Sequence, residues 1–200
     1  MFRTKGEKSL IITGCADKFF SVGFDFKQLV HSNDPKLKFD LLTGLIKILR
    51  RVILFEMPTI ALINGHCYAG GLMLAMSCDW RIMLDGCGDV CLSEATLGMN
   101  LPVGIRTLLR IKMTPTALRT AVLTGKKYSC KEAVEAQIVD EMVMKRADLM
   151  ERGIGFAEAL SKLSHNRPNY KRLKYDLYYE IVEEFKKGEK SPVDMTFAKL

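Results

Sequence analysis

The chain has 200 residues, of which 48% are hydrophobic and 26% are charged, an ordinary balance for one globular domain with a real core. Its net charge of +7 suits phosphates, acidic membranes or nucleic acid, but no basic arm, RNA-binding aromatic motif or zinc-finger spacing accompanies that charge, so a nucleic-acid partner is not expected. Glu56, Pro58, Asn64 and His66 interrupt the apolar runs, which excludes a membrane-spanning segment.

The first third of the chain is predicted to form a strand, a loop and a long helix. Residues 9–13 read as a short strand, and residues 14–21 read as a loop. Between residues 35 and 57, leucine, isoleucine and valine recur at helical spacing, which predicts an amphipathic helix whose apolar stripe belongs to the core. Pro58 is expected to end this helix.

The next stretch combines a strand, a glycine turn and a helix start. Residues 59–63 form a β-branched apolar run that predicts a buried strand, and Asn64-Gly65 signals a turn. Ala69-Gly70-Gly71 then opens a segment of good helix formers, and residues 80–84 predict another strand. The first amides of a helix have no intrahelical partner, and glycines let a negative oxygen approach them. Tight packing of strand against helix is the alternative interpretation of these glycines.

The second half of the chain is predicted to be mostly helical. Five segments have helical periodicity or capping signals: residues 102–113, 115–124, 129–137, 147–163 and 168–187. Thr114 precedes a proline as an N-cap, and Gly125 fits the helix stop that follows. Ser129 and Glu132 have the spacing of a capping box. Residues 138–139 are expected to form a brief strand.

Three segments, in this order, together resemble the crotonase, or enoyl-CoA hydratase/isomerase, family. Residues 19–26, FFSVGFDF, resemble the first oxyanion loop of that family. Residues 64–79, NGHCYAGGLMLAMSCD, resemble the second oxyanion loop with its helix, and residues 93–98, SEATLG, resemble the segment of the catalytic acid. The resemblance runs from about residue 9 to residue 140. Within the family it is nearest to the peroxisomal, plant-type Δ3,Δ2-enoyl-CoA isomerases.

The resemblance implies an α/β fold, with a crotonase-like spiral core of ββα units followed by C-terminal helices. Family members carry a few dozen residues before the strand at residues 9–13, so the chain is expected to be N-terminally shortened, with open sheet edges and an incomplete adenine pocket. The core is expected over residues 1–145 and a helical region over residues 146–200. Since the last helices of the family pack in trimer contacts, a homotrimer or hexamer is expected.

The resemblance also implies roles for individual residues. The amides of Phe24 and Gly70 are expected to donate to a thioester oxygen, and Glu94 matches the retained catalytic glutamate. The implied substrate-binding positions are Ser21, Val22, Gly23, Phe24, Asp25, Gly70, Gly71 and Met73. The apolar neighbours of Glu94 predict a desolvated carboxyl with a raised pKa. From the residues alone, a surface turn glutamate is the alternative for Glu94, and a helix cap is the better interpretation of Asp25.

Within the family, the presence and position of a second carboxylate determine which reaction a member catalyses. Hydratases carry another glutamate where this chain has Met73, and dienoyl isomerases carry acids there and near Pro102. Because methionine cannot activate water, the expected reaction is the shift of a 3-enoyl-CoA to the trans-2-enoyl-CoA used in β-oxidation. It takes an acyl-CoA substrate and no metal or other cofactor. Hydration, or a non-catalytic remnant that binds acyl-CoA or only joins an oligomer, remain the alternatives.

Two further clusters invite functional interpretations. His66 and Asp79 lack a nucleophile on an elbow motif, so a structural role is favoured for His66. The basic residues at the start of the last helical segment are candidates for contacts with CoA phosphates, although a charged helix face is favoured: Arg167, Lys171, Arg172 and Lys174.

The cysteines and the two ends of the sequence indicate a compartment. The six cysteines show neither a disulfide framework nor zinc spacing, which favours reduced thiols inside the cell. The start, MFRTKGEKSL, lacks the apolar segment of a secretory signal. Ala198-Lys199-Leu200 has the form of a peroxisomal address, so the chain is expected to bind the peroxisomal import receptor and to reside in the peroxisome.

Overall fold

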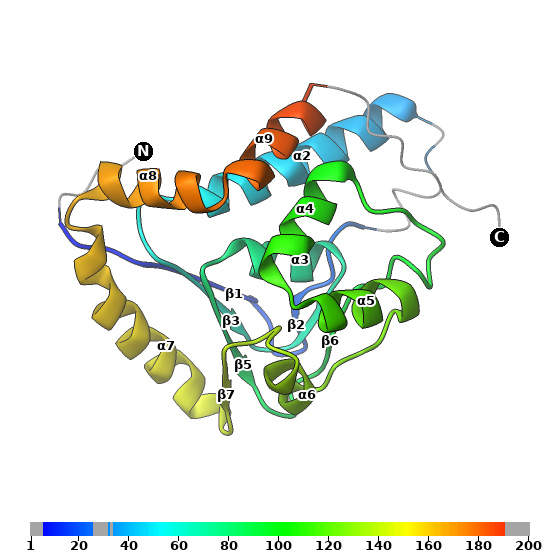
Figure 1. Cartoon of the computed structure of the whole chain (residues 1–200). Coiled ribbons are helices and arrows are strands. Elements are labelled where there is room, and N and C mark those ends of the chain that lie inside the picture. The colour runs from blue at the N-terminus through cyan, green and yellow to red at the C-terminus, as the bar shows by residue number, and fades with distance from the viewer. Residues whose placement is uncertain (1–5, 26–31, 33, 191–200) are drawn as a thin grey trace.

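The strands of the chain alternate between two parallel sheets. A computed structural model of the whole chain describes residues 6–25, 32 and 34–190 (Figure 1). The larger sheet has the strand order β1 (Leu10–Thr13), β3 (Thr59–Ile63), β5 (Trp80–Leu84), β7 (Glu141–Val143). The smaller sheet has the order β2 (Phe19–Ser21), β4 (His66–Tyr68), β6 (Val90–Cys91).

A unit of two strands and a helix repeats along the chain. In one unit, β3 of the larger sheet is followed by β4 of the smaller sheet and then by α3 (Gly70–Ser77). In the next unit, β5 and β6 lead to α4 (Val103–Lys112). Each new strand pairs in parallel with the strand of the preceding unit, so the chain advances as a spiral. The α/β fold and the spiral of ββα units predicted from the sequence are therefore confirmed.

One face of the larger sheet is covered by a single long helix, α7 (Arg146–Ser161), as Figure 1 shows. Leu62 and Ile82 of the sheet pack against Leu149 and Ala157 of this helix. Gly153 lies directly over Leu62, where a larger side chain would clash with the leucine methyl groups. The close approach of helix and sheet therefore depends on this glycine.

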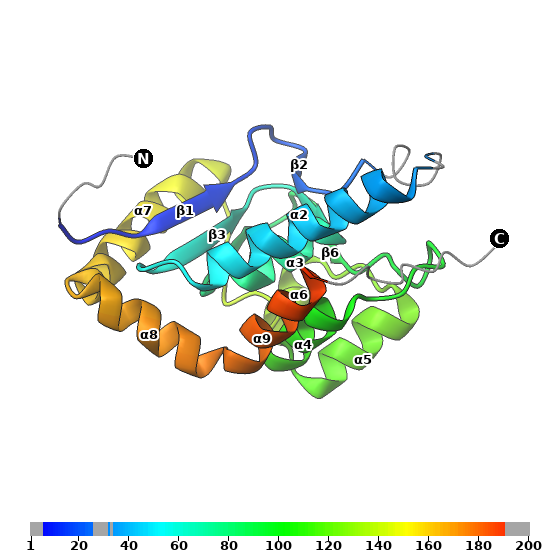
Figure 2. The same cartoon turned by 90° about the horizontal axis from the view of Figure 1, so that it is seen from above.

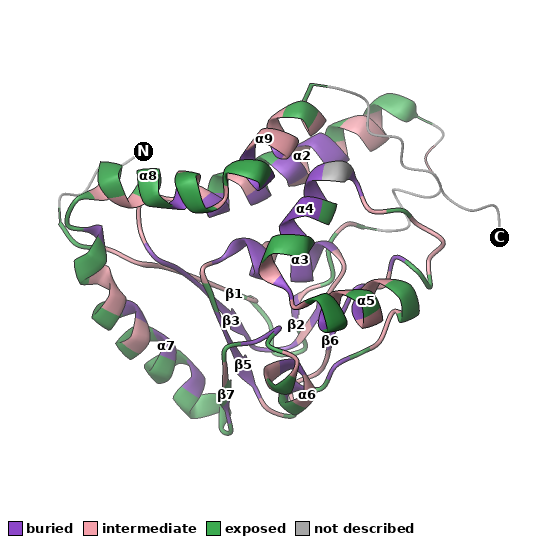
Figure 3. Cartoon of the chain, viewed as in Figure 1, coloured by how far each residue is buried: buried purple, intermediate pink, exposed green. Residues whose placement is uncertain are grey.

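The main core lies on the other side, among α2 (Pro35–Ile53), α3, α4 and α9 (Tyr179–Gly188). Strands β3 and β5 and the inward faces of these helices are buried, as Figure 3 shows. Seen from above in Figure 2, α8 (Arg167–Leu177) runs along one end of the molecule and joins α7 to α9. No helix among the described residues combines the length and the apolar character that crossing a bilayer requires.

The predicted capping signals are confirmed. Thr114 accepts a hydrogen bond from the Ala117 amide at the start of α5 (Pro115–Thr124), and Gly125 ends this helix with φ 61°. Ser129 and Glu132 form the reciprocal capping box of α6 (Cys130–Glu135). These interactions are local, so the spacing of the residues is sufficient to predict them.

Two of the observed strands differ in position from what the sequence predicts. Residues 19–21 belong to β2 rather than to a loop, because β4 pairs with them. The strand expected at Ile138 and Val139 lies at β7 instead, a few residues later. The amides of Ile138 and Val139 both donate to the carbonyl of Ala133, which holds these two residues at the end of α6.

The helix boundaries also differ at two places. The segment 168–187 is two helices, α8 and α9, because Tyr178 leaves the helical conformation between them, with φ −114° and ψ 25°. Helix α2 ends at Ile53, before the expected stop at Pro58. The Phe55 amide donates to the Val52 carbonyl at 3.2 Å, three residues back, so the helix closes with a tighter turn before the chain reaches Pro58.

Candidate active site

The junction between β4 and α3 has an unusual backbone. Ala69 has φ 48° and ψ −120°, a region that residues with a Cβ rarely adopt. Its amide donates to the Cys91 carbonyl of β6 at 2.9 Å, and its carbonyl accepts from the Met73 amide at 3.0 Å. Gly70 follows as the first residue of α3, where an amide has no acceptor within the helix and lies at the positive end of the helix dipole.

The two glycine-containing loops are in direct backbone contact. Gly23 has φ 83°, and a Cβ on it would lie 2.8 Å from the Gly70 nitrogen. A Cβ on Gly71 would collide with the carbonyl of Ser21, whose hydroxyl accepts a hydrogen bond from the Gly23 amide at 3.2 Å. Glycine is therefore required on both sides of this contact, which brings the loop that carries Phe24 beside the start of α3.

A cavity of about 80 Å³ opens at this contact. Its lining includes five of the residues implied by the sequence: Val22, Phe24, Gly70, Met73 and Glu94. Helices α2 and α4 supply apolar side chains to the remaining wall, among them Leu42, Leu45 and Ile105. The structure thus brings the two loops and the acidic segment together around one small apolar space.

Glu94 carries the one carboxyl group among the described lining residues of this cavity. The residue is only 7% exposed, so it is not a glutamate of a surface turn. Its Oε2 atom is buried without a hydrogen-bond partner among the described residues. Burial raises the pKa of the Glu94 carboxyl, and a hydrogen bond from its own backbone opposes this only in part. The carbonyl of Glu94 accepts from the Met99 amide at 2.9 Å, which holds the turn.

The other predicted site residues are not among the lining residues of the cavity. Ser21, Gly23 and Gly71 do not line it, but they shape the contact between the two loops. Asp25 is exposed at the end of a described segment, and the helix turn that it was expected to cap falls on residues 26–31, which lie outside the described residues. Among the described residues, no group of three or more His, Cys, Asp or Glu side chains is arranged for a metal ion.

The sequence did not identify the helical part of the wall. The apolar stripe of α2 was assigned to the core alone, yet Leu42 and Leu45 of this stripe line the cavity. Ile105 of α4 was likewise not singled out. Core residues and cavity residues share the same helical periodicity, so no local signal separates them.

His66 begins β4, beyond the C-terminal end of β3, whereas Asp79 contacts the N-terminal end of β3, so the two side chains have separate sets of partners. His66 Nδ1 lies 2.9 Å from the Tyr68 hydroxyl and 3.2 Å from the Asp89 amide nitrogen. The Asp79 carboxylate accepts from the Thr59 amide at 2.8 Å, at the start of β3. The structural role predicted for His66 agrees with these contacts.

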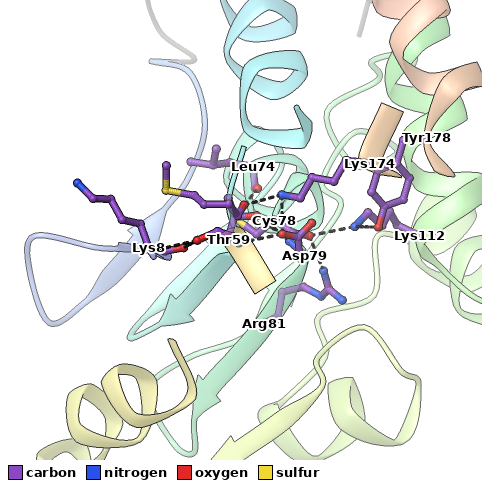
Figure 4. A network of polar contacts seen from close by, with 11 residues as sticks. Lys8, Thr59, Leu74, Cys78, Asp79, Arg81, Lys112, Lys174 and Tyr178 are labelled. Atoms are coloured by element: carbon purple, nitrogen blue, oxygen red, sulfur yellow. Dashed lines mark hydrogen bonds and ion pairs between the residues drawn. The ribbon is translucent and has the colours of Figure 1, made fainter. Parts of the chain in front are cut away.

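Asp79 is instead the centre of a buried polar network, which Figure 4 shows. Lys174 of α8 is 5% exposed and donates to Asp79 Oδ2 at 2.6 Å and to the Met57 carbonyl at 2.9 Å. The prediction that Lys174 belongs to a charged helix face is therefore wrong, because this side chain turns inward to the largely buried carboxylate of Asp79. Its neighbours Lys171 and Arg172 do form exposed ion pairs, with Glu56 and Asp176 respectively.

Sequence comparison matches this chain to proteins that are named for reactions of CoA esters. The family model for enoyl-CoA hydratase/isomerase matches residues 2–187. The Arabidopsis thaliana protein named enoyl-CoA delta isomerase 3 is 32% identical over 89% of this chain and 76% of its own length. The peroxisomal enoyl-CoA delta isomerase 1 of the same plant is 31% identical over 96% of this chain and 81% of its own. A carnitinyl-CoA dehydratase of Shigella flexneri is 32% identical over 75% of this chain and 56% of its own.

Solved structures show the same fold. An enoyl-CoA hydratase from Mycobacterium ulcerans Agy99 has a TM-score of 0.83 at 24% identity and covers 92% of this chain and 78% of its own. The human mitochondrial delta3-delta2-enoyl-CoA isomerase has a TM-score of 0.79 at 20% identity, with 92% of this chain and 74% of its own covered.

Proposed function

We propose, from the premise that this chain belongs to the enoyl-CoA hydratase/isomerase family, that it is an isomerase that converts a 3-enoyl-CoA to the trans-2-enoyl-CoA. The observation that carries this proposal is the buried carboxyl of Glu94, the one carboxyl among the described residues that line the apolar cavity beside the start of α3. The isomerase names of the two Arabidopsis relatives support it.

In this proposal the substrate binds with its thioester oxygen on the amides of Phe24 and Gly70. A proton next to a thioester becomes acidic only when the enolate oxygen is stabilised, and one such donor is worth roughly 3 kcal/mol. The dipole of α3 adds to the stabilisation at the Gly70 amide. Because Gly70 is the first residue of this helix, its amide is available for a ligand.

Glu94 then moves one proton within the substrate. Its carboxylate removes a proton from C2, and the electron pair of the C–H bond passes through the carbonyl carbon to the oxygen. The resulting dienolate spans C1 to C4 and takes the same proton from Glu94 at C4. The double bond now lies between C2 and C3, and the carboxylate is regenerated. The substrate undergoes no net oxidation or reduction, because C4 gains the hydrogen that C2 loses, so the step needs no redox partner.

Hydration of a 2-enoyl-CoA is the second candidate, and it is supported by the name of one relative, a carnitinyl-CoA dehydratase. Met73 argues against it, because this side chain is 4% exposed in the cavity wall and cannot hold or activate a water molecule. Incubation with crotonyl-CoA separates the two candidates, since a hydratase forms the 3-hydroxyacyl product and the proposed isomerase does not. A chain that neither unfolds cooperatively nor converts 3-hexenoyl-CoA would be a non-catalytic remnant.

The direct test is the isosteric change Glu94→Gln. We expect the turnover of 3-hexenoyl-CoA to fall by about a thousandfold, within the range for removal of a general base. The affinity for a saturated acyl-CoA should stay within about threefold, because the shape of the cavity is preserved. Glu158→Gln, an exposed change on α7, is the matched control and should leave both values unchanged. Normal turnover by the Glu94 variant would refute the assignment.

We also propose that the protein acts in the peroxisome as a homotrimer or hexamer. A related Arabidopsis isomerase is named as peroxisomal, and the tripeptide Ala198-Lys199-Leu200, which lies outside the described residues, fits the import receptor. Assembly is supported by large apolar side chains exposed on α8 and α9: Leu173, Leu177 and Tyr179. Light scattering on the purified chain would test the oligomeric state, and the mass of a monomer would contradict the proposed trimer or hexamer.

A further inference from the structure

We infer that the cavity selects short acyl chains, of about four to six carbons, because buried side chains from three helices close its inner end. The inference rests on the proposed function, since it assumes that an acyl thioester occupies this cavity. It adds a substrate class to that function, and it identifies the residues that set the limit.

The cavity has an open side and a closed side. Val22 is 45% exposed and Asn100 is also exposed, so the entrance lies between the first loop and the segment after Glu94. Leu42, Met73 and Ile105 are 3%, 4% and 1% exposed and form the closed side. A bulky CoA group fits only outside the entrance, so the acyl tail must run inward from Glu94 toward these three side chains.

The volume of the cavity limits what it can hold. For comparison, an enclosed apolar cavity of about 150 Å³ holds one benzene molecule, which has six carbon atoms. The cavity of about 80 Å³ has about half that volume, so only the first few carbons of an acyl chain fit inside it. With the thioester at the entrance, an acyl chain of about four to six carbons reaches the closed side, and a longer tail would have to displace the side chains there.

Displacing the side chains of the closed side would cost considerable free energy. Leu42 and Ile105 belong to the main core, where α2 and α4 both pack against α3 and α9. Inserting further methylene groups into such a core forces the surrounding side chains out of their preferred conformations. Met73 is unbranched and adapts more readily, so Leu42 and Ile105 are the fixed part of the wall.

The wild-type protein should therefore show a sharp dependence on chain length. Across 3-enoyl-CoA substrates, kcat/KM should rise by roughly fourfold for each added methylene until the cavity is full. It should then fall by about tenfold or more at ten and twelve carbons, as expected for groups that a closed pocket excludes. The dissociation constants of butanoyl-, hexanoyl- and decanoyl-CoA, measured by calorimetry, should follow the same order without any turnover.

Replacing a residue of the closed side with a smaller one should move the chain length at which kcat/KM is highest. Ile105→Ala removes three carbon atoms from the closed side, so the preferred chain should lengthen by about two to three carbons. Leu109→Ala is the matched control, because Leu109 is buried in the same helix but does not line the cavity. It should lower stability to a similar extent while the chain-length profile stays unchanged. If Ile105→Ala does not fold, Leu42→Ala makes the same opening from α2.

The outcomes separate this inference from the proposed function. If kcat/KM for the ten-carbon substrate equals or exceeds the value for the six-carbon substrate, the inference is overturned and the isomerase proposal still stands. Absence of turnover with every substrate would overturn the isomerase proposal, and the acyl-CoA affinities would then decide the inference alone. A preference for hexanoyl-CoA that shifts in the Ile105 variant but not in the Leu109 variant would support it.

Discussion

At the scale of single residues, Glu94 has properties that suit a base better than they suit a stable fold. The carboxyl is buried, and its Oε2 atom has no hydrogen-bond partner among the described residues. Such a group costs free energy when it is ionised, because water would solvate it better than the apolar wall does. The same penalty raises the pKa of the carboxyl, which makes its carboxylate a stronger base toward the C2 proton of a thioester.

This conflict predicts that Glu94→Gln stabilises the protein at neutral pH while it abolishes activity. The pKa of Glu94 is raised in the folded state relative to the unfolded state, so the penalty is fully present above the folded pKa and disappears as the pH falls below the unfolded value. Urea unfolding at pH 7.5 should show a gain of about 1–3 kcal/mol, the cost of an unsatisfied buried group. At pH 4 most of this gain should be lost.

Glu158→Gln serves again as the control for this measurement, because its side chain is exposed on α7 and should change stability little at either pH. A Glu94 variant that is less stable than the wild type at pH 7.5 would contradict the penalty. An equal gain at both pH values would show that the gain does not come from the ionised carboxyl.

At the scale of structural elements, the site depends on the contact between the first loop and the start of α3. Gly23→Ala should disturb this contact, since Gly23 has φ 83° and the new Cβ would lie 2.8 Å from the Gly70 nitrogen. A displacement of about 1 Å between the two loops costs on the order of a hundredfold in rate. We therefore expect kcat for 3-hexenoyl-CoA to fall by about that factor, with a loss of roughly 1–2 kcal/mol in stability.

Gly44→Ala is the matched control for this change. Gly44 lies within α2, and a Cβ at this position would meet no atom within 4 Å. Alanine in a helix interior is favoured over glycine by about 1 kcal/mol, so this variant should gain stability and keep its kcat. Normal activity in the Gly23 variant would mean that the two loops are not a catalytic unit.

The attachment of α8 to the core depends on a second contact between elements, the buried pair of Lys174 and Asp79. Both side chains are largely buried, and Lys174 also donates to the Met57 carbonyl. Lys174→Met should cost about 3–5 kcal/mol in urea unfolding, because it leaves the Asp79 charge buried without its partner. Lys171→Met removes the exposed pair with Glu56 and should cost less than about 1 kcal/mol. Equal effects would show that the buried position of the pair does not matter.

The elements also show which features a sequence can predict. The caps at Thr114 and Ser129 were predictable, because each depends on a hydrogen bond to a residue three positions away. The position of β7 was not, since contacts of Ile138 and Val139 with Ala133 move the strand along the chain. Glu94 was identified through its motif, whereas Ile105 has no motif and belongs to the site only through the way its helix packs.

At the scale of the whole molecule, the spiral explains why residues so distant in sequence share one cavity. Successive units place β4 beside β2 and β6 beside β4, so the segments that follow these three strands lie next to one another. The segment after β2 carries Phe24, the one after β4 begins α3 at Gly70, and the one after β6 carries Glu94. The cavity therefore forms only when the smaller sheet is assembled.

The last prediction concerns where the whole molecule works. A fluorescent protein fused to the N-terminus leaves Ala198-Lys199-Leu200 free, and such a fusion should accumulate in peroxisomes, because the receptor reads a C-terminal tripeptide of small, basic and leucine residues. Deleting residues 198–200 should leave the fusion diffuse in the cytosol. Lys199→Glu is a sharper variant, since it keeps the length and reverses one charge. Peroxisomal accumulation of either altered chain would contradict the assigned address.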